Sequence, residues 1–379
     1  MGDVLIYADT IRSPELRHEV PVAVGDPFLY VERDGVRHIV ISTHEIPIIS
    51  PAGEYVFHPP EEFGIDELRR TARSYAEMAN EITVRAVKGL GVERATVPAS
   101  FPLLTADKLR AAGVELNPDH GFFTDRRRVK TGAELAGIRR AQAAAGAGMA
   151  AAASLLRRSS ADHQGVLELD GRPLTVEELK AAISGEFMAN GASADEFVVS
   201  HGAQAAIGHH LGHGKIRASE TIVIDLWPRD SESGCFADMS RTFVVGEVPD
   251  EIAEWHRLSV EAHELALAAV RPGITGRSLY DLACEVFERE GHLTQRTKIA
   301  GETAQDGFLF ALGHGVGLEV HELPILGILG HDELVAGDVL AIEPGVYRGG
   351  FGGLRVEDLV LVTDDGYENL THFPYDLAP

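Results

Sequence analysis

The stretch Gly313-His314-Gly315-Val316-Gly317-Leu318-Glu319-Val320-His321-Glu322 (residues 313–322) decides how the rest of the chain is interpreted. Its two histidines stand seven residues apart among glycines, which let a ligand approach the backbone closely. We expect its Leu-Glu-Val-His part to be strand-like. The pattern is poor for a hydrophobic core and favours a functional site.

One acidic hairpin is predicted before this stretch and another after it, and each arm of each hairpin carries one carboxylate. The first carries Asp225 and Asp238, and the second carries Glu343 and Glu357. The spacings are similar, because 238 minus 225 is 13 and 357 minus 343 is 14. If the arms of each hairpin pair, both of its acids can lie on one face of the sheet.

These four carboxylates and His314 together indicate a metal site. An acid that is buried between apolar residues without a partner costs several kcal/mol or becomes protonated, and a divalent cation removes that penalty. An oxygen-rich set with one nitrogen suits two divalent ions, Mn or Co before Zn, because structural zinc prefers Cys and His. Two such ions, about 3.5–4 Å apart, would activate a shared water and polarise a carbonyl.

A group of histidines precedes the first acidic hairpin, at His201, His209, His210 and His213. A separate metal site is one interpretation. The small residues among them, and their position just before the first acidic strand, favour a loop that faces the substrate. His209 is the candidate that would hydrogen-bond a developing oxyanion or move a proton.

The hydrophobic pattern predicts an α+β protein with two domains, a smaller α/β domain over 1–128 and a larger one over 129–379. Thr131 with Glu134, and Thr175 with Glu178, have the spacing of helix capping boxes. The predicted helices cover 65–88, 105–112, 134–157, 177–189, 250–270 and 279–290. The predicted strands cover 28–32 and 37–42 around the turn Asp34-Gly35, then 95–98, 114–116, 196–200, 221–226 and 235–245, before a β-rich block over 309–362.

The composition excludes several classes of protein. Of 379 residues, 58 are acidic and 34 basic, and the net charge of -24 would repel nucleic acid and anionic membranes. The basic run 126–130 is interpreted as a solvated linker. Two cysteines outside any CxxC pair fit a reducing, cytoplasmic location. The N-terminus lacks the apolar segment of a secretory signal, and the apolar run 141–156 is shorter than the roughly 20 residues of a membrane span.

From residue 127 onward, in the sequence RRVKTGAELAGIRRA and the motifs that follow it, the chain resembles the pita-bread metallopeptidases. These include methionine aminopeptidase, aminopeptidase P and prolidase. The preceding α/β part resembles the N-terminal domain of the creatinase, prolidase and aminopeptidase P branch. The residues that carry the likeness, together with the motifs GHGVGLEVHE, IEPG and LRVED, are His209, Asp225, Asp238, His314, His321, Glu343 and Glu357.

The resemblance implies a pita-bread catalytic domain and a metal-dependent exopeptidase, an Xaa-Pro aminopeptidase or Xaa-Pro dipeptidase. Glu343 would take a proton from a water that bridges two metal ions, with Mn preferred over Co or Zn. His209 and His321 would hold the substrate carbonyl, and Arg355 matches a position close to the site in aminopeptidase P relatives. The partners implied are a peptide substrate and a second copy in a homodimer. The implied metal ligands are Asp225, Asp238, His314, Glu343 and Glu357.

Two positions depart from that family pattern. Many relatives have glycine where this chain has Trp227, and a histidine four residues before the metal histidine is here Phe310. Both departures bear on substrate range. One alternative is a small-amide hydrolase on the same fold, like creatinase or an ectoine-derivative hydrolase, although creatinase works without the metal that a complete ligand set indicates. Another is a non-catalytic binding module, which usually loses ligands and carries basic extensions.

Overall fold

The computed structural model describes residues 2–379. By their internal contacts these residues form two compact units. The smaller holds the chain up to Arg127 together with Glu232–Gly234, and the larger holds Arg128–Ser231 with Cys235–Pro379. The main division falls after Arg127, one residue before the predicted boundary, and the assignment of two domains over 1–128 and 129–379 stays a prediction.

The smaller unit is built on a six-stranded sheet with the strand order β4-β3-β2-β1-β5-β6. The antiparallel half, β1 to β3, and the parallel pairs β1 with β5 and β5 with β6 give the mixed α/β character that was predicted. Its strands are β1 (Asp3–Ala8), β2 (Phe28–Arg33), β3 (Val36–Val40), β4 (Val56–His58), β5 (Arg94–Val97) and β6 (Glu115–Pro118). Its helices are α1 (Pro14–Glu19), α2 (Ile46–Ile49), α3 (Ile65–Thr71), α4 (Tyr75–Gly89), α5 (Leu103–Ala111) and α6 (His120–Arg128), with 3-10 turns η1 (Ser50–Ala52) and η2 (Pro60–Phe63).

Two local predictions in this unit have opposite outcomes. The turn between β2 and β3 is confirmed, since Asp34 and Gly35 have φ of 51° and 76°, as a two-residue hairpin turn requires. The single helix over 65–88 is wrong. Ala72 leaves the helical region, and the Ser74 side chain accepts a hydrogen bond from the Glu77 amide to start α4 anew. Hydrophobic spacing continues across such a break, so it does not reveal the new cap.

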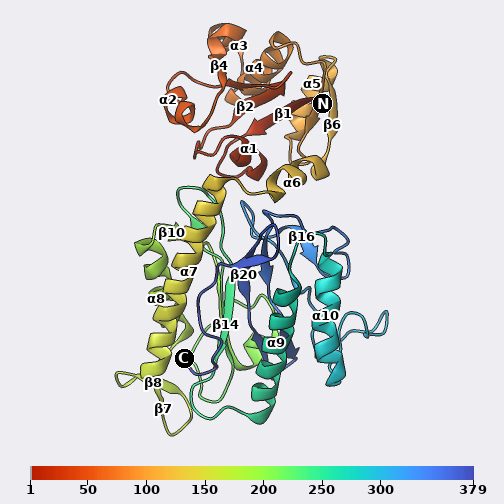
Figure 1. The fold of residues 1–379 in the computed structure, drawn as a ribbon. Coiled ribbons are helices and arrows are strands. Elements are labelled where there is room, and N and C mark those ends of the chain that lie inside the picture. The colour runs from red at the N-terminus through yellow and green to blue at the C-terminus, as the bar shows by residue number, and fades with distance from the viewer. Residues whose placement is uncertain (1) are drawn as a thin grey trace. The chain divides into compact units, whose positions relative to one another are not determined.

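The larger unit repeats one arrangement, two helices and then a sheet. Helices α7 (Gly132–Arg158) and α8 (Val176–Ala189) pack against the sheet β11-β12-β14, and α9 (Asp250–Ala269) and α10 (Gly276–Arg289) pack against the sheet β16-β15-β17-β20-β21. In Figure 1 the two helix pairs flank the strands of this unit. The strands of the two sheets are β11 (Val198–His201), β12 (Ile222–Leu226), β14 (Met239–Phe243), β15 (Gly313–Gly315), β16 (Glu322–Leu326), β17 (Val339–Ile342), β20 (Asp358–Val362) and β21 (Tyr367–Asn369).

The remaining elements are short. They are β7 (Ser160–Ala161), β8 (Leu167–Leu169), β9 (Arg172–Pro173), β10 (Ala192–Ser193), β13 (Arg229–Asp230), β18 (Gly345–Arg348), β19 (Gly352–Arg355) and the 3-10 turn η3 (Gly202–Ala206).

Both predicted capping boxes are present at the N-termini of α7 and α8. The alanine-rich helix α7 approaches α8 closely, because a Cβ atom on Gly148 would lie 2.9 Å from the Phe187 ring. The small side chains of the run 141–156 therefore serve helix packing. Within residues 2–379, no helix is long and apolar enough to cross a membrane.

Two predictions around the acidic motifs are corrected. Residues 317–321 form a bent loop between β15 and β16 and not a strand, because the backbone there turns back after Gly315. The second acidic hairpin is also not one continuous pair. Ile342 of β17 pairs with Asp358 of β20, and the hairpin β18–β19 is inserted between them. Glu343 and Glu357 therefore stand where one pairing ends and the next begins.

The basic run 126–130 was predicted to be a solvated linker, and this prediction is wrong. Arg128 Nη2 lies 2.8 Å from Asp338 Oδ2, and buried Lys130 forms an ion pair with buried Glu322. The acidic partners come from more than 190 positions away in the chain, so a local charge pattern does not reveal them.

Candidate metal centre and substrate site

The two sheets of the larger unit meet at Ser240 and bring the acidic strands together. Asp225 of β12 is paired with Ser240 of β14, two positions after Asp238. The Glu357 amide donates a hydrogen bond of 3.1 Å to the Ser240 carbonyl. This bridge places the end of the first acidic hairpin beside the end of the second.

Three of the predicted ligands converge closely. One ligand atom from each of Asp238, His314 and Glu357 lies within 4.8 Å of the other two. Their exposed fractions are only 4%, 6% and 1%. Two acids and an imidazole that gather at such depth need a compensating charge.

The His314 ring is oriented for binding a metal through Nε2. Its Nδ1 lies 3.0 Å from the Gly315 carbonyl, which only accepts, so Nδ1 carries the proton. Nε2 then presents its lone pair toward Glu343 Oε1 at 3.5 Å and Asp238 Oδ2 at 3.8 Å. A backbone carbonyl that fixes the tautomer in this way is a common support for a metal-binding histidine.

Arg355 neutralises the other two acids. Its guanidinium lies 3.1 Å from Asp225 Oδ2 through Nη2 and 2.5 Å from Glu343 Oε2 through Nη1. Burial alone would lower the pKa of Arg355, but Asp225, then Tyr347 and Glu343, raise it well above its ordinary value. The arginine therefore stays charged between the two carboxylates.

Asp238 and Glu357 lack such a cation. Burial raises the pKa of both carboxyls well above the ordinary range, and repulsion from neighbouring acids adds to the effect. Within the part of the chain that the structure describes, Asp225 Oδ1 and Glu357 Oε2 are buried without a hydrogen-bond partner. A divalent cation would satisfy these oxygens and return the acids to their ionised form, so the residues fit a metal centre.

The two histidines that were predicted to hold the substrate, His209 and His321, line a cavity of about 740 Å³, which we call the site cavity. His209 and His321 are both exposed on its wall, and Asp225, Asp238, His314, Glu343 and Arg355 line it as well. The His321 ring is 4.3 Å from that of His314, centroid to centroid, in an edge-to-face arrangement. Burial first, and His314 second, lower the pKa of His321, so its ring is neutral at neutral pH.

Both departures from the family pattern lie on this wall, since Trp227 and Phe310 line the site cavity. Sequence reasoning missed Tyr347, which also lines it and whose pKa burial raises to about 12. Gly345 and Tyr347 stand two residues apart in β18 and both face the cavity. Side chains at alternate positions of a strand lie on the same face, so a strand that begins just after Glu343 could have indicated from the sequence that Tyr347 faces the site.

Residues 136–364 match the family described as metallopeptidase family M24. The chain belongs to this family. Among curated relatives in M24, an Xaa-Pro dipeptidase of Pyrococcus furiosus is 33% identical over 197 residues, which cover 51% of this chain and 53% of the relative. The chain thus matches about half the length of the curated relatives it resembles.

Solved structures match the M24 chain over nearly its whole length. An Xaa-Pro dipeptidase from Bacillus anthracis aligns with a TM-score of 0.79 and 22% identity, covering 99% of this chain and 94% of that one. An X-Pro aminopeptidase from Thermotoga maritima aligns with a TM-score of 0.78 and 20% identity, covering 98% and 96%. The predicted α+β fold, a pita-bread part preceded by a smaller α/β part, is confirmed.

Proposed function

We propose that this M24 protein is a metal-dependent exopeptidase that hydrolyses the Xaa-Pro bond at the N-terminus of peptides or in dipeptides. The observation that carries the proposal is the convergence of Asp238, His314 and Glu357, of which Asp238 and His314 line a cavity that also displays His209 and His321. Relatives named Xaa-Pro dipeptidase support the choice of bond.

Two divalent ions, Mn before Co or Zn, fit the donor set of four carboxylates and one imidazole. Bound there, they would supply Lewis acidity and lower the pKa of a water that attacks the peptide carbonyl. The ligands would be Asp225, Asp238, His314, Glu343 and Glu357.

Glu343 is the proposed general base. Its side chain is 16% exposed, and Oε1 faces His314 while Oε2 accepts a hydrogen bond from Arg355. The hydrogen bond from Arg355 occupies Oε2 and leaves Oε1, which would accept the proton of the attacking water and pass it to the leaving amine.

His209 and His321 would donate hydrogen bonds to the peptide carbonyl oxygen. Both face the site cavity, and a neutral imidazole has one N–H for this task. Donors fixed before the reaction stabilise the negative charge that develops on that oxygen. The proline ring of the substrate would lie against the apolar part of the wall, which includes Trp227 and Phe310.

The decisive experiment compares the chelated protein before and after addition of Mn, Co or Zn. Its substrates are Ala-Pro, Ala-Pro-Gly and the proline-free peptide Met-Ala-Gly. We expect Mn to restore cleavage of the Ala-Pro bond, and Asp238→Asn to abolish it. The matched control is Asp364→Asn, at an exposed acid outside the site cavity. Cleavage that persists without metal, or in the Asp238 variant, would overturn the proposal.

We further propose a cytoplasmic homodimer, on the grounds of the acidic charge, the scarcity of cysteine and the resemblance to the family. Light scattering at several concentrations tests the dimer. A mass of one chain at every concentration would contradict it.

A further inference from the structure

A second cavity of about 910 Å³, which we call the outer cavity, lies against the site cavity. The two cavities share Phe310 and Tyr347 in their walls. These rings form an edge-to-face pair, with centroids 5.2 Å apart. The aromatic pair is therefore the stretch of wall that the two chambers share, and we call it the partition.

The two chambers differ in charge. The site cavity is lined by one arginine, Arg355, and by four acids, whereas Lys298 is the one charged residue among those that line the outer cavity. The four acids are Glu196, Asp225, Asp238 and Glu343. Lys298 is exposed. In a chain with a net charge of -24, a cavity wall without a carboxylate and with one lysine favours an anionic group.

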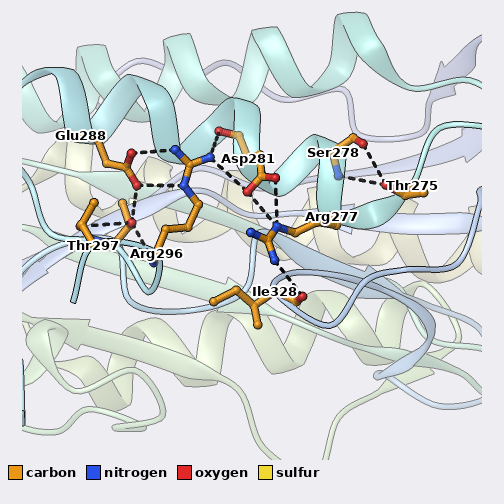
Figure 2. A network of polar contacts seen from close by, with 9 residues as sticks. Thr275, Arg277, Ser278, Asp281, Glu288, Arg296, Thr297 and Ile328 are labelled. Atoms are coloured by element: carbon orange, nitrogen blue, oxygen red, sulfur yellow. Dashed lines mark hydrogen bonds and ion pairs between the residues drawn. The ribbon is translucent and has the colours of Figure 1, made fainter. Parts of the chain in front are cut away.

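An ion-pair ladder on α10 fixes the segment that carries Lys298 (Figure 2). Arg296 Nη2 lies 2.8 Å from Glu288 Oε2, and Arg296 Nη1 lies 3.1 Å from Asp281 Oδ1. The Lys298 amide donates to the Thr294 carbonyl at 2.9 Å. The turn that displays Lys298 is thus held against the helix.

The same ladder fixes another part of the wall. Arg277 Nε donates to Asp281 at 2.9 Å, and its Nη1 donates to the Ile328 carbonyl at 3.2 Å (Figure 2). Ile328 lines the outer cavity. Gln295, also in the wall, donates from Nε2 to the Leu309 carbonyl at 2.6 Å. Because Asp281 contacts both arginines, it links the side of the outer cavity that carries Lys298 to the side that carries Ile328.

The outer cavity also presents apolar side chains to solvent. Ile207 is 60% exposed and Phe310 is 46% exposed, and both line it. A ligand that covers such surface gains free energy from removing it from water. The wall therefore combines apolar contact with one positive charge.

We propose that the outer cavity binds the part of a peptide that follows the cleaved bond, with Lys298 pairing with its C-terminal carboxylate. The preferred substrates are then longer than dipeptides. The inference rests on the proposed function, because an exopeptidase that removes the N-terminal residue keeps the substrate ammonium in the acidic site cavity. The remaining chain then runs past Phe310 and Tyr347 toward Lys298.

The test compares peptides of the form Ala-Pro-Gly, extended by zero to three glycines, each as free acid and as C-terminal amide. With wild type we expect the free acid to be bound and cleaved about two- to fivefold better than the amide at the length that reaches Lys298, as for an exposed ion pair. Lys298→Ala removes the difference and leaves Ala-Pro turnover unchanged. The matched control is Lys215→Ala, at an exposed lysine that lines neither cavity.

A second variant tests the volume of the outer cavity. Ala203 is exposed on its wall, so Ala203→Trp should fill it and weaken binding of the longer peptides without affecting Ala-Pro. Calorimetry with metal-free protein measures the ratio of the affinity for the free acid to that for the amide, without hydrolysis. A ratio of one at every peptide length would overturn the inference. Equal losses of affinity for short and long peptides in Ala203→Trp would overturn it as well. A lack of any hydrolysis with a ratio above one would overturn only the proposed function.

Discussion

The two pairs of carboxylates in the site are compensated differently. Asp225 and Glu343 share the guanidinium of Arg355, whereas Asp238 and Glu357 are buried without a cation. The two pairs mix the hairpins, since each hairpin gives one acid to each pair. The protein therefore places its own cation beside one pair of acids and none beside the other, and we expect the metal to compensate the second pair together with the unpartnered Asp225 Oδ1.

The largest expected effect comes from neutralising the uncompensated half. Glu357→Gln should lower metal content and reduce kcat/KM by about 1000-fold or more, equivalent to about 4 kcal/mol. The same change should raise the melting temperature of the metal-free protein, because burial, Asp238 and Asp225 oppose the ionised form that this carboxyl has in the unfolded chain. Metal analysis and calorimetry check both parts. A lower melting temperature without metal would break the comparison.

Removing the cation that Asp225 and Glu343 share should destabilise the metal-free protein, in contrast to Glu357→Gln. Arg355→Met leaves Asp225 and Glu343 buried without their partner, and should destabilise the metal-free protein by about 3–5 kcal/mol. Denaturant unfolding measures this loss. The control is Arg348→Met, because Arg348 forms a more exposed pair with Glu251, which should contribute about 1 kcal/mol or less. Similar losses in both variants would contradict the assigned role of Arg355.

Asp358, the acid next to Glu357, has its own positively charged partner and lies close to a buried histidine. This arrangement predicts that the stability of the fold depends on pH. Asp358 pairs with Arg241 at 2.8 Å, and His263 is fully buried 3.9 Å from its Oδ2. Burial, aided by Arg241, lowers the pKa of His263 to about 4, although Asp358 opposes the shift.

The unfolded chain therefore binds a proton at this histidine in the window between pH 6.5 and 4, where the folded chain does not. Stability is full above pH 6.5 and falls as the pH drops, by about 2 kcal/mol at pH 5. Denaturant unfolding at pH 7 and pH 5 measures this loss. In His263→Gln the difference should shrink by that amount, and an unchanged difference would refute the assignment.

The smallest effect is expected at the partition. Phe310→His should change kcat/KM for Ala-Pro by less than about tenfold, since one ring replaces another of similar shape. Metal content should stay at the wild-type value, because the Phe310 ring packs on Tyr347, which is not one of the proposed ligands. A loss of metal in this variant would show that the partition supports the centre.

Features with a local cause were predictable from the sequence. The capping boxes of α7 and α8 and the turn at Asp34-Gly35 depend on residues within one turn of each other, and each forms as expected. The carboxylates of the proposed site could be selected from the sequence because an acid at the end of an apolar strand is costly to bury without a partner. The structure brings Asp238, His314 and Glu357 together, but their binding of a metal stays a prediction.

Features with a distant cause were not predictable. The loop 317–321 is set by Glu322, whose carboxylate accepts hydrogen bonds from the Leu318 and Glu319 amides and pairs with Lys130. The sharing of Arg355 by Asp225 and Glu343 also joins separate hairpins. No spacing along the chain encodes which arm of one hairpin will face which arm of another.

The bridge between Ser240 and Glu357 has a consequence for how the protein is made. Arg241 reinforces it by donating to the Glu357 carbonyl, from 116 positions away in the chain. A ribosome that synthesises the chain from its N-terminus exposes Asp225 and Asp238 long before residue 357 emerges. Glu357, the last of the proposed ligands along the chain, joins the others only through this long-range contact. Tight metal binding would therefore begin only after most of the larger unit has been synthesised, and loading would be a late step of maturation.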